Sequence, residues 1–246
     1  MLCRKAGLAW FAGVIGVAAA AAAWPATSST TIYAPATAIG FAAFASGWVC
    51  LFGATYLGAC VGAEDHEQNT IKELHLAGRG RTEVLWERVV AVAIVSLAMP
   101  SVAVLTAAWV VAGEMVAQHL RAAAPASATS APLFLFSAAL IGSLFSGFMG
   151  FALAWATRSR LLGFLGWLGL TFAYASLVPA VSDNALVATV LRYVPSGPLL
   201  DAFLGQGNYL DRNLSFSATS AVVSFVGTTA ALLILLAMQA RTRSLA

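Results

Sequence analysis

The sequence predicts an all-α membrane protein in which about six helices cross the bilayer, and three observations lead to this fold class. First, 60% of the 246 residues are hydrophobic and 9% are charged, whereas soluble globular chains are about 45–50% apolar and about 25% charged. Second, the apolar residues gather in six runs of about the length that crosses a bilayer as a helix. Third, the Lys and Arg residues between these runs favour one side of the membrane.

The six apolar runs are expected to be the spans of one transmembrane domain that covers the whole chain. They comprise residues 8–24, 36–63, 89–113, 132–156, 161–181 and 218–238. The first run follows Arg4 and Lys5, so it also fits a signal peptide; we interpret it as a span, and its removal in the cell stays open. The third run contains Pro100, which a membrane helix tolerates when neighbours satisfy the freed carbonyl. Small residues recur in 50–62 and 142–150 and predict close helix packing there.

The orientation follows from the Lys and Arg residues. If six spans place both ends of the chain on one side, ten of the thirteen basic residues share that side. These are Arg4, Lys5, Lys72, Arg79, Arg81, Arg88, Arg158, Arg160, Arg241 and Arg243, against Arg121, Arg192 and Arg212 on the other side. Because cytoplasmic loops carry the excess of Lys and Arg, we predict that the N- and C-termini and segment 64–88 are cytoplasmic. The basic residues form no patch, so no nucleic-acid partner is expected.

Segment 64–88 is the one strongly charged part of the chain, with six of the ten acidic and four of the thirteen basic residues. Ile71, Leu74 and Ala77 recur at helical spacing with charges between them, which predicts a short amphipathic helix. Gly78 and Gly80 predict a turn before the third span. So short a helix is unstable alone in water. The segment is therefore either a solvated loop with some helix or a helix that docks on a cytoplasmic partner.

Segment 64–88 resembles the first cytoplasmic loop of the permeases of type-2 ATP-binding-cassette (ABC) exporters. That family carries an acidic residue, Gly-Thr-Leu or a relative, a Leu, a helix-ending Pro, a basic residue and a cation that opens the next span. The matching residues are Glu64 or Glu67, Thr70 with Ile71, Leu74, Arg81 and Arg88. The sequence departs from this pattern where Asn69 replaces Gly and Gly78 replaces Pro, although both residues suit a turn or helix end.

Segment 182–217 carries a second resemblance to the same family. There, the extracellular link before the last span often forms two short helices that dip into the membrane. Pro195, Gly197 and Pro198 would break such a pair of helices apart. The resemblance implies an extracellular short-helix segment in which these three residues belong to a gate. An ordinary surface loop with one interfacial helix is the alternative.

The resemblance implies a membrane-spanning permease subunit of an ATP-driven exporter, multi-pass in a bacterial cell membrane. Two permease chains, identical or related, would pair in the lipid, and two separate ABC ATPase subunits would bind below them. Glu64, Asp65, Glu67 and Glu73 would meet basic groups on the ATPase. The ATPase would itself bind ATP and Mg, so this chain needs no cofactor. Because the predicted outside loops are short, we expect an apolar or amphipathic substrate, such as a lipid, peptide or antibiotic.

The residues predict no catalytic, cofactor or metal site, so the chain is not expected to be an enzyme. Lys5 and Lys72 are its only lysines and neither follows a GxxxxGK[ST] loop. Thr70 stands where the second His of HExxH would be. Ionisable groups in mid-span usually mark ion or proton pathways, and their absence here favours an external driving force. Two alternatives stay open: a membrane assembly or accessory protein without transport activity, and an ion-coupled secondary transporter.

Overall fold

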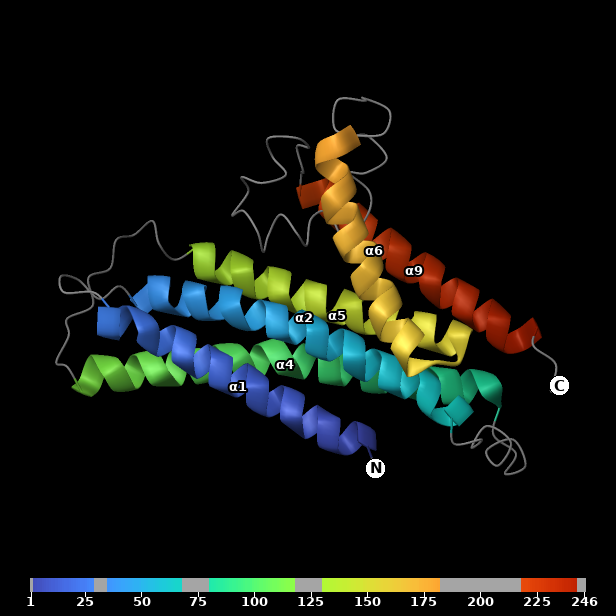
Figure 1. The fold of residues 1–246 in the computed structure, drawn as a ribbon, viewed down its shortest axis with the longest axis horizontal. Helices are drawn as coiled ribbons and strands as arrows, with labels where there is room; N and C mark the ends of the chain where they lie inside the picture. Colours follow the sequence, from blue (N-terminus) through green and yellow to red (C-terminus); the bar gives the residue numbers. More distant parts are fainter. Residues whose placement is uncertain (1, 29–34, 68–79, 118–129, 182–217, 243–246) are drawn as a thin grey trace. The chain divides into compact units, whose positions relative to one another are not determined.

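The computed structural model describes residues 2–28, 35–67, 80–117, 130–181 and 218–242, and the regular elements in these ranges are all α-helices (Figure 1). They are α1 (Leu2–Ser28), α2 (Pro35–Glu67), α4 (Arg81–Ala117), α5 (Ser130–Thr157), α6 (Arg160–Val181) and α9 (Ala218–Thr242). Each of the six predicted runs lies within one of these helices.

Four of the helices contain a stretch long and apolar enough to cross a membrane. The stretches are Lys5–Trp24, Phe41–Glu64, Thr82–Glu114 and Ala139–Thr157. A shorter apolar stretch, Val223–Met238, lies in α9. These helices confirm the predicted fold class, an all-α polytopic membrane protein.

The described helices form two compact units, and three helices run through both. Unit 1 comprises Met1–Ala54 with Ile94–Leu144, and unit 2 comprises Thr55–Ala93 with Phe145–Ala246. Unit 1 therefore contains α1, and unit 2 contains α6 and α9, while α2, α4 and α5 each contribute one part to either unit.

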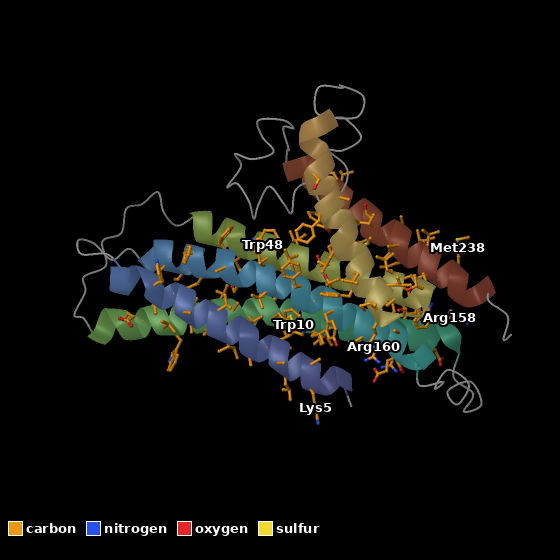
Figure 2. The ribbon with its side chains drawn as sticks, viewed as in Figure 1. Lys5, Trp10, Trp48, Arg158, Arg160 and Met238 are labelled. Atoms are coloured by element: carbon orange, nitrogen blue, oxygen red, sulfur yellow. The ribbon has the colours of Figure 1, made fainter. Side chains whose placement is uncertain are left out.

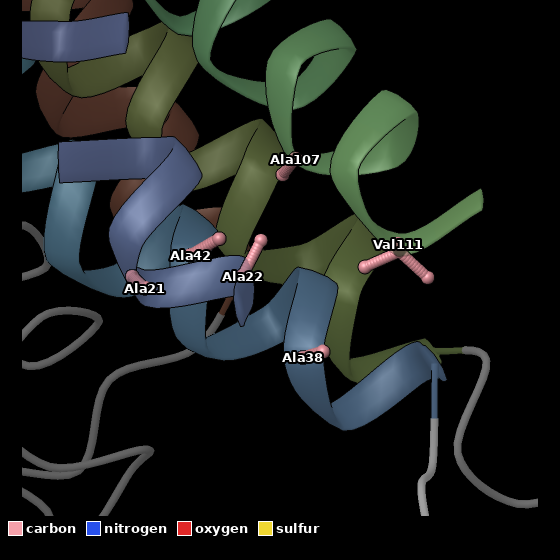
Figure 3. Packing of buried hydrophobic residues seen from close by; sticks show 6 residues of the cluster. All are labelled: Ala21, Ala22, Ala38, Ala42, Ala107 and Val111. Atoms are coloured by element: carbon pink, nitrogen blue, oxygen red, sulfur yellow. The ribbon is translucent and has the colours of Figure 1, made fainter. Parts of the chain in front are cut away.

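At one end of unit 1, α1, α2 and α4 pack through small side chains (Figure 3). The buried cluster consists of Ala21 and Ala22 of α1, Ala38 and Ala42 of α2, and Ala107 and Val111 of α4. Small residues let membrane helices approach closely, which favours their association where lipid removes the hydrophobic drive. Because the late parts of α1 and α4 meet the early part of α2, α2 runs opposite to the other two helices, as successive membrane crossings require.

Further along unit 1, a methionine side chain fills the space beside a glycine. A Cβ built at Gly53 of α2 would lie 3.1 Å from the sulfur of Met99 and 3.2 Å from the ring of Trp10. Met99 is fully buried and precedes Pro100, at which α4 continues as a helix. Just after the proline, the Ser101 Oγ donates to the carbonyl of Leu97 at 2.8 Å.

In unit 2, α2 and α5 meet backbone to backbone at three glycines. These are Gly58 and Gly62 of α2 and Gly150 of α5. A Cβ at Gly58 would collide with the carbonyl oxygen of Gly147, one at Gly62 with that of Phe151, and one at Gly150 with that of Thr55. The small residues that the sequence places in 50–62 and 142–150 thus let the two backbones touch at these points.

Helix α6 packs on the same part of α5 through a fourth glycine. A Cβ at Gly163 would lie 2.5 Å from the Cβ of Ala154 and 2.8 Å from the carbonyl oxygen of Gly150. Phe164, the next residue, packs against the buried cluster of Ala59, Ala63 and Ala154. It also meets Tyr56 of α2 edge-on, with ring centroids 5.6 Å apart. One turn of α6 therefore contacts both α2 and α5.

An aromatic cluster joins α5, α6 and α9 in unit 2. Phe145 of α5 lies edge-on to Trp167 of α6 and to Phe225 of α9, with both pairs of ring centroids 5.4 Å apart. The indole Nε1–H of Trp167 donates to Ser146 Oγ at 3.2 Å. Because this hydrogen bond is buried, it satisfies two polar groups that water cannot reach.

The turn between α5 and α6 is tight and contains a strained residue. Thr157 Oγ1 donates to the carbonyl of Leu153 at 2.6 Å at the end of α5. Arg158 then takes a φ of 59°, the left-handed region that residues with a Cβ enter at a cost. Ser159 precedes α6 and caps its first turn, because the Ser159 Oγ accepts from the backbone N–H of Leu162 at 3.4 Å, as an N-cap residue does.

We expect Arg158→Val to destabilise the protein by about 1–2 kcal/mol, because a β-branched residue fits the left-handed region poorly. Arg158→Gln is the matched control, since it also removes the charge but keeps an unbranched Cβ. In thermal unfolding in detergent, Arg158→Val should have a lower midpoint temperature than Arg158→Gln. Equal midpoints for the two variants would contradict a left-handed conformation at this position.

Candidate partner-binding surface at segment 64–88

The predicted partner-binding residues fall partly within the described helices. Glu64 and Glu67 lie in the last turn of α2, Arg81 opens α4, and Arg88 lies two turns further along α4. The remaining predicted residues lie outside the described ranges: Thr70, Ile71, Glu73, Leu74 and Gly78, and the gate residues Pro195, Gly197 and Pro198.

Helix α4 begins eight residues before the predicted span that started at residue 89, and its first turn is capped. Gly80 precedes the helix, and its carbonyl accepts from the backbone N–H groups of Glu83 and Val84 at 3.0 and 3.2 Å. The Glu83 carboxylate reaches back and accepts from the Gly80 N–H at 3.3 Å. This is the glutamate half of a capping box, and the negative charge is also favoured by the positive end of the helix dipole.

The start of α4 has one buried face and one exposed face. Val84, Leu85 and Val89 are buried, which explains why the helix forms before the long apolar run begins. Glu83, Trp86 and Glu87 are exposed and recur at i, i+3 and i+4, which places them on one side of the helix. We name these three residues the acidic–aromatic face.

The acidic–aromatic face has the chemistry to receive a basic surface. The carboxylates of Glu83 and Glu87 lie one turn apart on the exposed side of the helix, so this side presents acidic groups to a partner. Trp86 adds a ring on which an Arg or Lys side chain can stack. The face thus combines charge and apolar area on a rigid, capped helix.

The ends of α2, α4, α5 and α6 gather at one end of unit 2. α5 packs on α2 through Ala154 against Ala63. Both α2 and α5 end within four residues of this contact. The turn after α5 then brings in Arg158 and Arg160, which lie at the end of unit 2 where α2 ends and α4 begins (Figures 1 and 2). Acidic side chains from the end of α2 and the start of α4, and basic side chains from the α5–α6 turn and the start of α6, therefore share this end.

The acidic–aromatic face is not among the residues predicted from the sequence to bind a partner. The helical spacing of Val84, Leu85 and Arg88 predicts that the third span starts here on the cytoplasmic side, and α4 does include these residues. The same spacing leaves Glu83, Trp86 and Glu87 on the other side of the helix, but it does not mark them as a binding surface.

Among the described residues, no group of three or more His, Cys, Asp or Glu side chains is arranged to hold a metal ion. Comparisons of the chain with protein-family models, with curated proteins and with solved structures found no match. The resemblance of segment 64–88 to ABC permeases therefore stays a prediction.

Proposed function

We propose that this chain is the membrane-spanning permease subunit of an ATP-driven exporter of the ABC type-2 class. In this proposal a separate ATPase binds ATP and Mg and contacts segment 64–88, and a second permease chain completes the pathway through the lipid. The substrate is apolar or amphipathic, such as a lipid, peptide or antibiotic. The chain lies in a bacterial plasma membrane with both termini and segment 64–88 in the cytoplasm.

The observation that carries the proposal is the acidic–aromatic face at the start of α4. Glu83, Trp86 and Glu87 are exposed at a helix end, beside the loop whose residues resemble the ATPase contact of that class. A helix that continues from this contact into the membrane can transmit a push from a bound ATPase to the spans as a rigid body. The excess of Lys and Arg on the same predicted side supports a cytoplasmic position.

The proposal predicts that a nucleotide-binding chain co-purifies with this protein in mild detergent from the cells that make it. The partner should contain a GxxxxGK[ST] loop, and the complex should hydrolyse ATP. Reversing two charges together, as Glu67→Lys with Glu73→Lys or as Glu83→Lys with Glu87→Lys, should abolish most of the association. Two like charges at a basic interface cost several kcal/mol.

Glu114→Lys is the matched control, because it reverses an acidic residue near the other end of α4 and should leave the ATPase bound. Three results would contradict the proposal. They are a stable partner that lacks any ATPase, transport driven by an ion gradient without ATP, and an ATPase that stays bound to both double variants. The first result would favour an accessory protein and the second a secondary transporter.

A further inference from the structure

Helix α4 has one face buried by the protein and one face that carries large exposed apolar side chains. Taking about 100° per residue, its exposed acidic and large apolar side chains fall within an arc of about 140°. They are Glu83, Trp86, Glu87, Val90, Ile94, Leu97, Leu105 and Trp109. The buried residues Leu85, Val89, Val92, Met99, Ala103, Ala107 and Val111 occupy the opposite side. We call the exposed arc the outward face of α4.

The length of the outward face matches a bilayer. Trp86 is 50% exposed and Trp109 is 81% exposed, and 23 residues separate them along the helix. At about 1.5 Å per residue this is about 35 Å. A bilayer has a hydrocarbon core of about 30 Å and a total thickness of about 40–45 Å. Two rings about 35 Å apart therefore fit its two interfacial layers, which tryptophan prefers.

A second exposed tryptophan lies at the same level as Trp109. Trp24 of α1 is 64% exposed and follows Ala22 by two residues, while Trp109 stands between Ala107 and Val111. Ala22, Ala107 and Val111 belong to the same buried cluster of unit 1 (Figure 3). Two different helices thus carry an exposed indole at one end of this unit, as an aromatic belt requires.

The side chains on the outward face fit lipid better than another helix. The closest contacts between helices of this protein are made at glycine and alanine, as at Gly58, Gly150 and Ala107, and the larger side chains that join helices, such as Trp167, are buried. The outward face instead presents branched side chains such as Ile94 and Leu97 between its tryptophans. Charged residues are confined to its ends, since none occurs between Arg88 and Glu114.

We infer that the outward face of α4 contacts the acyl chains of a bilayer from Val90 to Leu105, with Trp86 in one interfacial layer beside Glu83 and Glu87, and with Trp24 and Trp109 in the other layer. Leu97 lies about midway between Trp86 and Trp109, which places it at the bilayer midplane. This inference assigns depth and lipid contact to named residues and does not depend on whether the protein transports anything.

Nitroxide labels on the full-length protein in dioleoylphosphatidylcholine liposomes test the inference. In a background with Cys3→Ser, Cys50→Ala and Cys60→Ala, single cysteines replace Leu97, Trp86, Trp109 and the buried Ala103. We expect the label at 97 to collide often with oxygen and rarely with a nickel chelate. Labels at 86 and 109 should show lower oxygen-to-nickel ratios, and the label at 103 should meet little of either.

Two outcomes would overturn the inference. Low oxygen access with dipolar coupling at 97 would mean that a second copy covers the face, and nickel access at 97 would mean that water reaches it. A second measurement needs no cysteine change. The emission of Trp109 is obtained as the difference between the unchanged protein and Trp109→Phe. Lipids brominated near the headgroup should quench this emission more than lipids brominated near the acyl end. Stronger quenching by the deep bromines would also overturn the assignment.

Discussion

Replacing Gly58 by alanine should destabilise the protein by about 2–3 kcal/mol, the upper range for inserting one carbon into a packed core. The added Cβ would collide with the carbonyl oxygen of Gly147. Because a backbone carbonyl cannot rotate away, α2 and α5 must move apart along this contact. The separation would also loosen the neighbouring contacts of Gly62 and Gly150, so the cost spreads beyond a single atom.

Gly169→Ala in α6 is the matched control for this prediction. A Cβ there meets nothing within 4 Å, so alanine should be neutral or stabilising by up to about 1 kcal/mol, as expected when a helical glycine is replaced. Unfolding of both variants in mixed detergent micelles, followed by circular dichroism, gives the comparison. If Gly58→Ala unfolded at or above the midpoint of Gly169→Ala, the backbone contact between α2 and α5 would be refuted.

Trp167→Ala should destabilise the protein by about 3–5 kcal/mol, the range for removing a buried aromatic side chain. Trp167 is buried between Phe145 and the Ser146 hydroxyl. Its loss opens a cavity where α5, α6 and α9 meet and leaves the Ser146 hydroxyl without its indole donor. The effect should appear as a lower midpoint and as earlier proteolysis of α6 and α9.

Two further variants separate packing from hydrogen bonding at this cluster. Trp167→Phe keeps a six-membered ring and removes the five-membered ring with its Nε1–H donor. Its cost should therefore fall between that of one interhelical hydrogen bond in a membrane, about 0.6–1.7 kcal/mol, and that of Trp167→Ala. Leu165→Ala, on the exposed side of the same helix, should stay within about 0.5 kcal/mol. A Trp167→Ala variant as stable as Leu165→Ala would show that the cluster does not hold α6.

The sequence predicts where the helices are much better than how they pair. Runs such as 89–113 are identified by length and composition alone, and α4 contains that run without interruption despite Pro100. Pairing is harder, because lipid is as apolar as a protein interior, so hydrophobicity does not distinguish the face of α6 that holds Trp167 from the face that holds Leu165. The contact between Trp167 and Ser146 joins residues 21 positions apart and has no signature in either run.

The candidate site was partly predictable for a different reason. The charge density of segment 64–88 identifies it as the unusual part of the chain. Glu64, Glu67 and Arg81 lie at helix ends and Arg88 lies two turns into α4, and their role in binding a partner stays a prediction. Charge density does not reveal that residues 81–88 continue a long helix. The helix start depends on the local cap between Gly80 and Glu83 and on the burial of Val84 and Leu85, and only the burial requires the tertiary contacts to be known.

The two kinds of glycine contact have different consequences for motion. Where Gly58 meets a carbonyl oxygen, neither helix has a side chain that can change rotamer, so α2 and α5 can shift in unit 2 only as a locked pair. Where Gly53 meets Met99, the partner is a flexible thioether with three rotatable bonds. A small shift of α2 against α4 in unit 1 can therefore be accommodated by a rotamer change of Met99. We expect this contact to be flexible and the glycine contacts of unit 2 to be rigid.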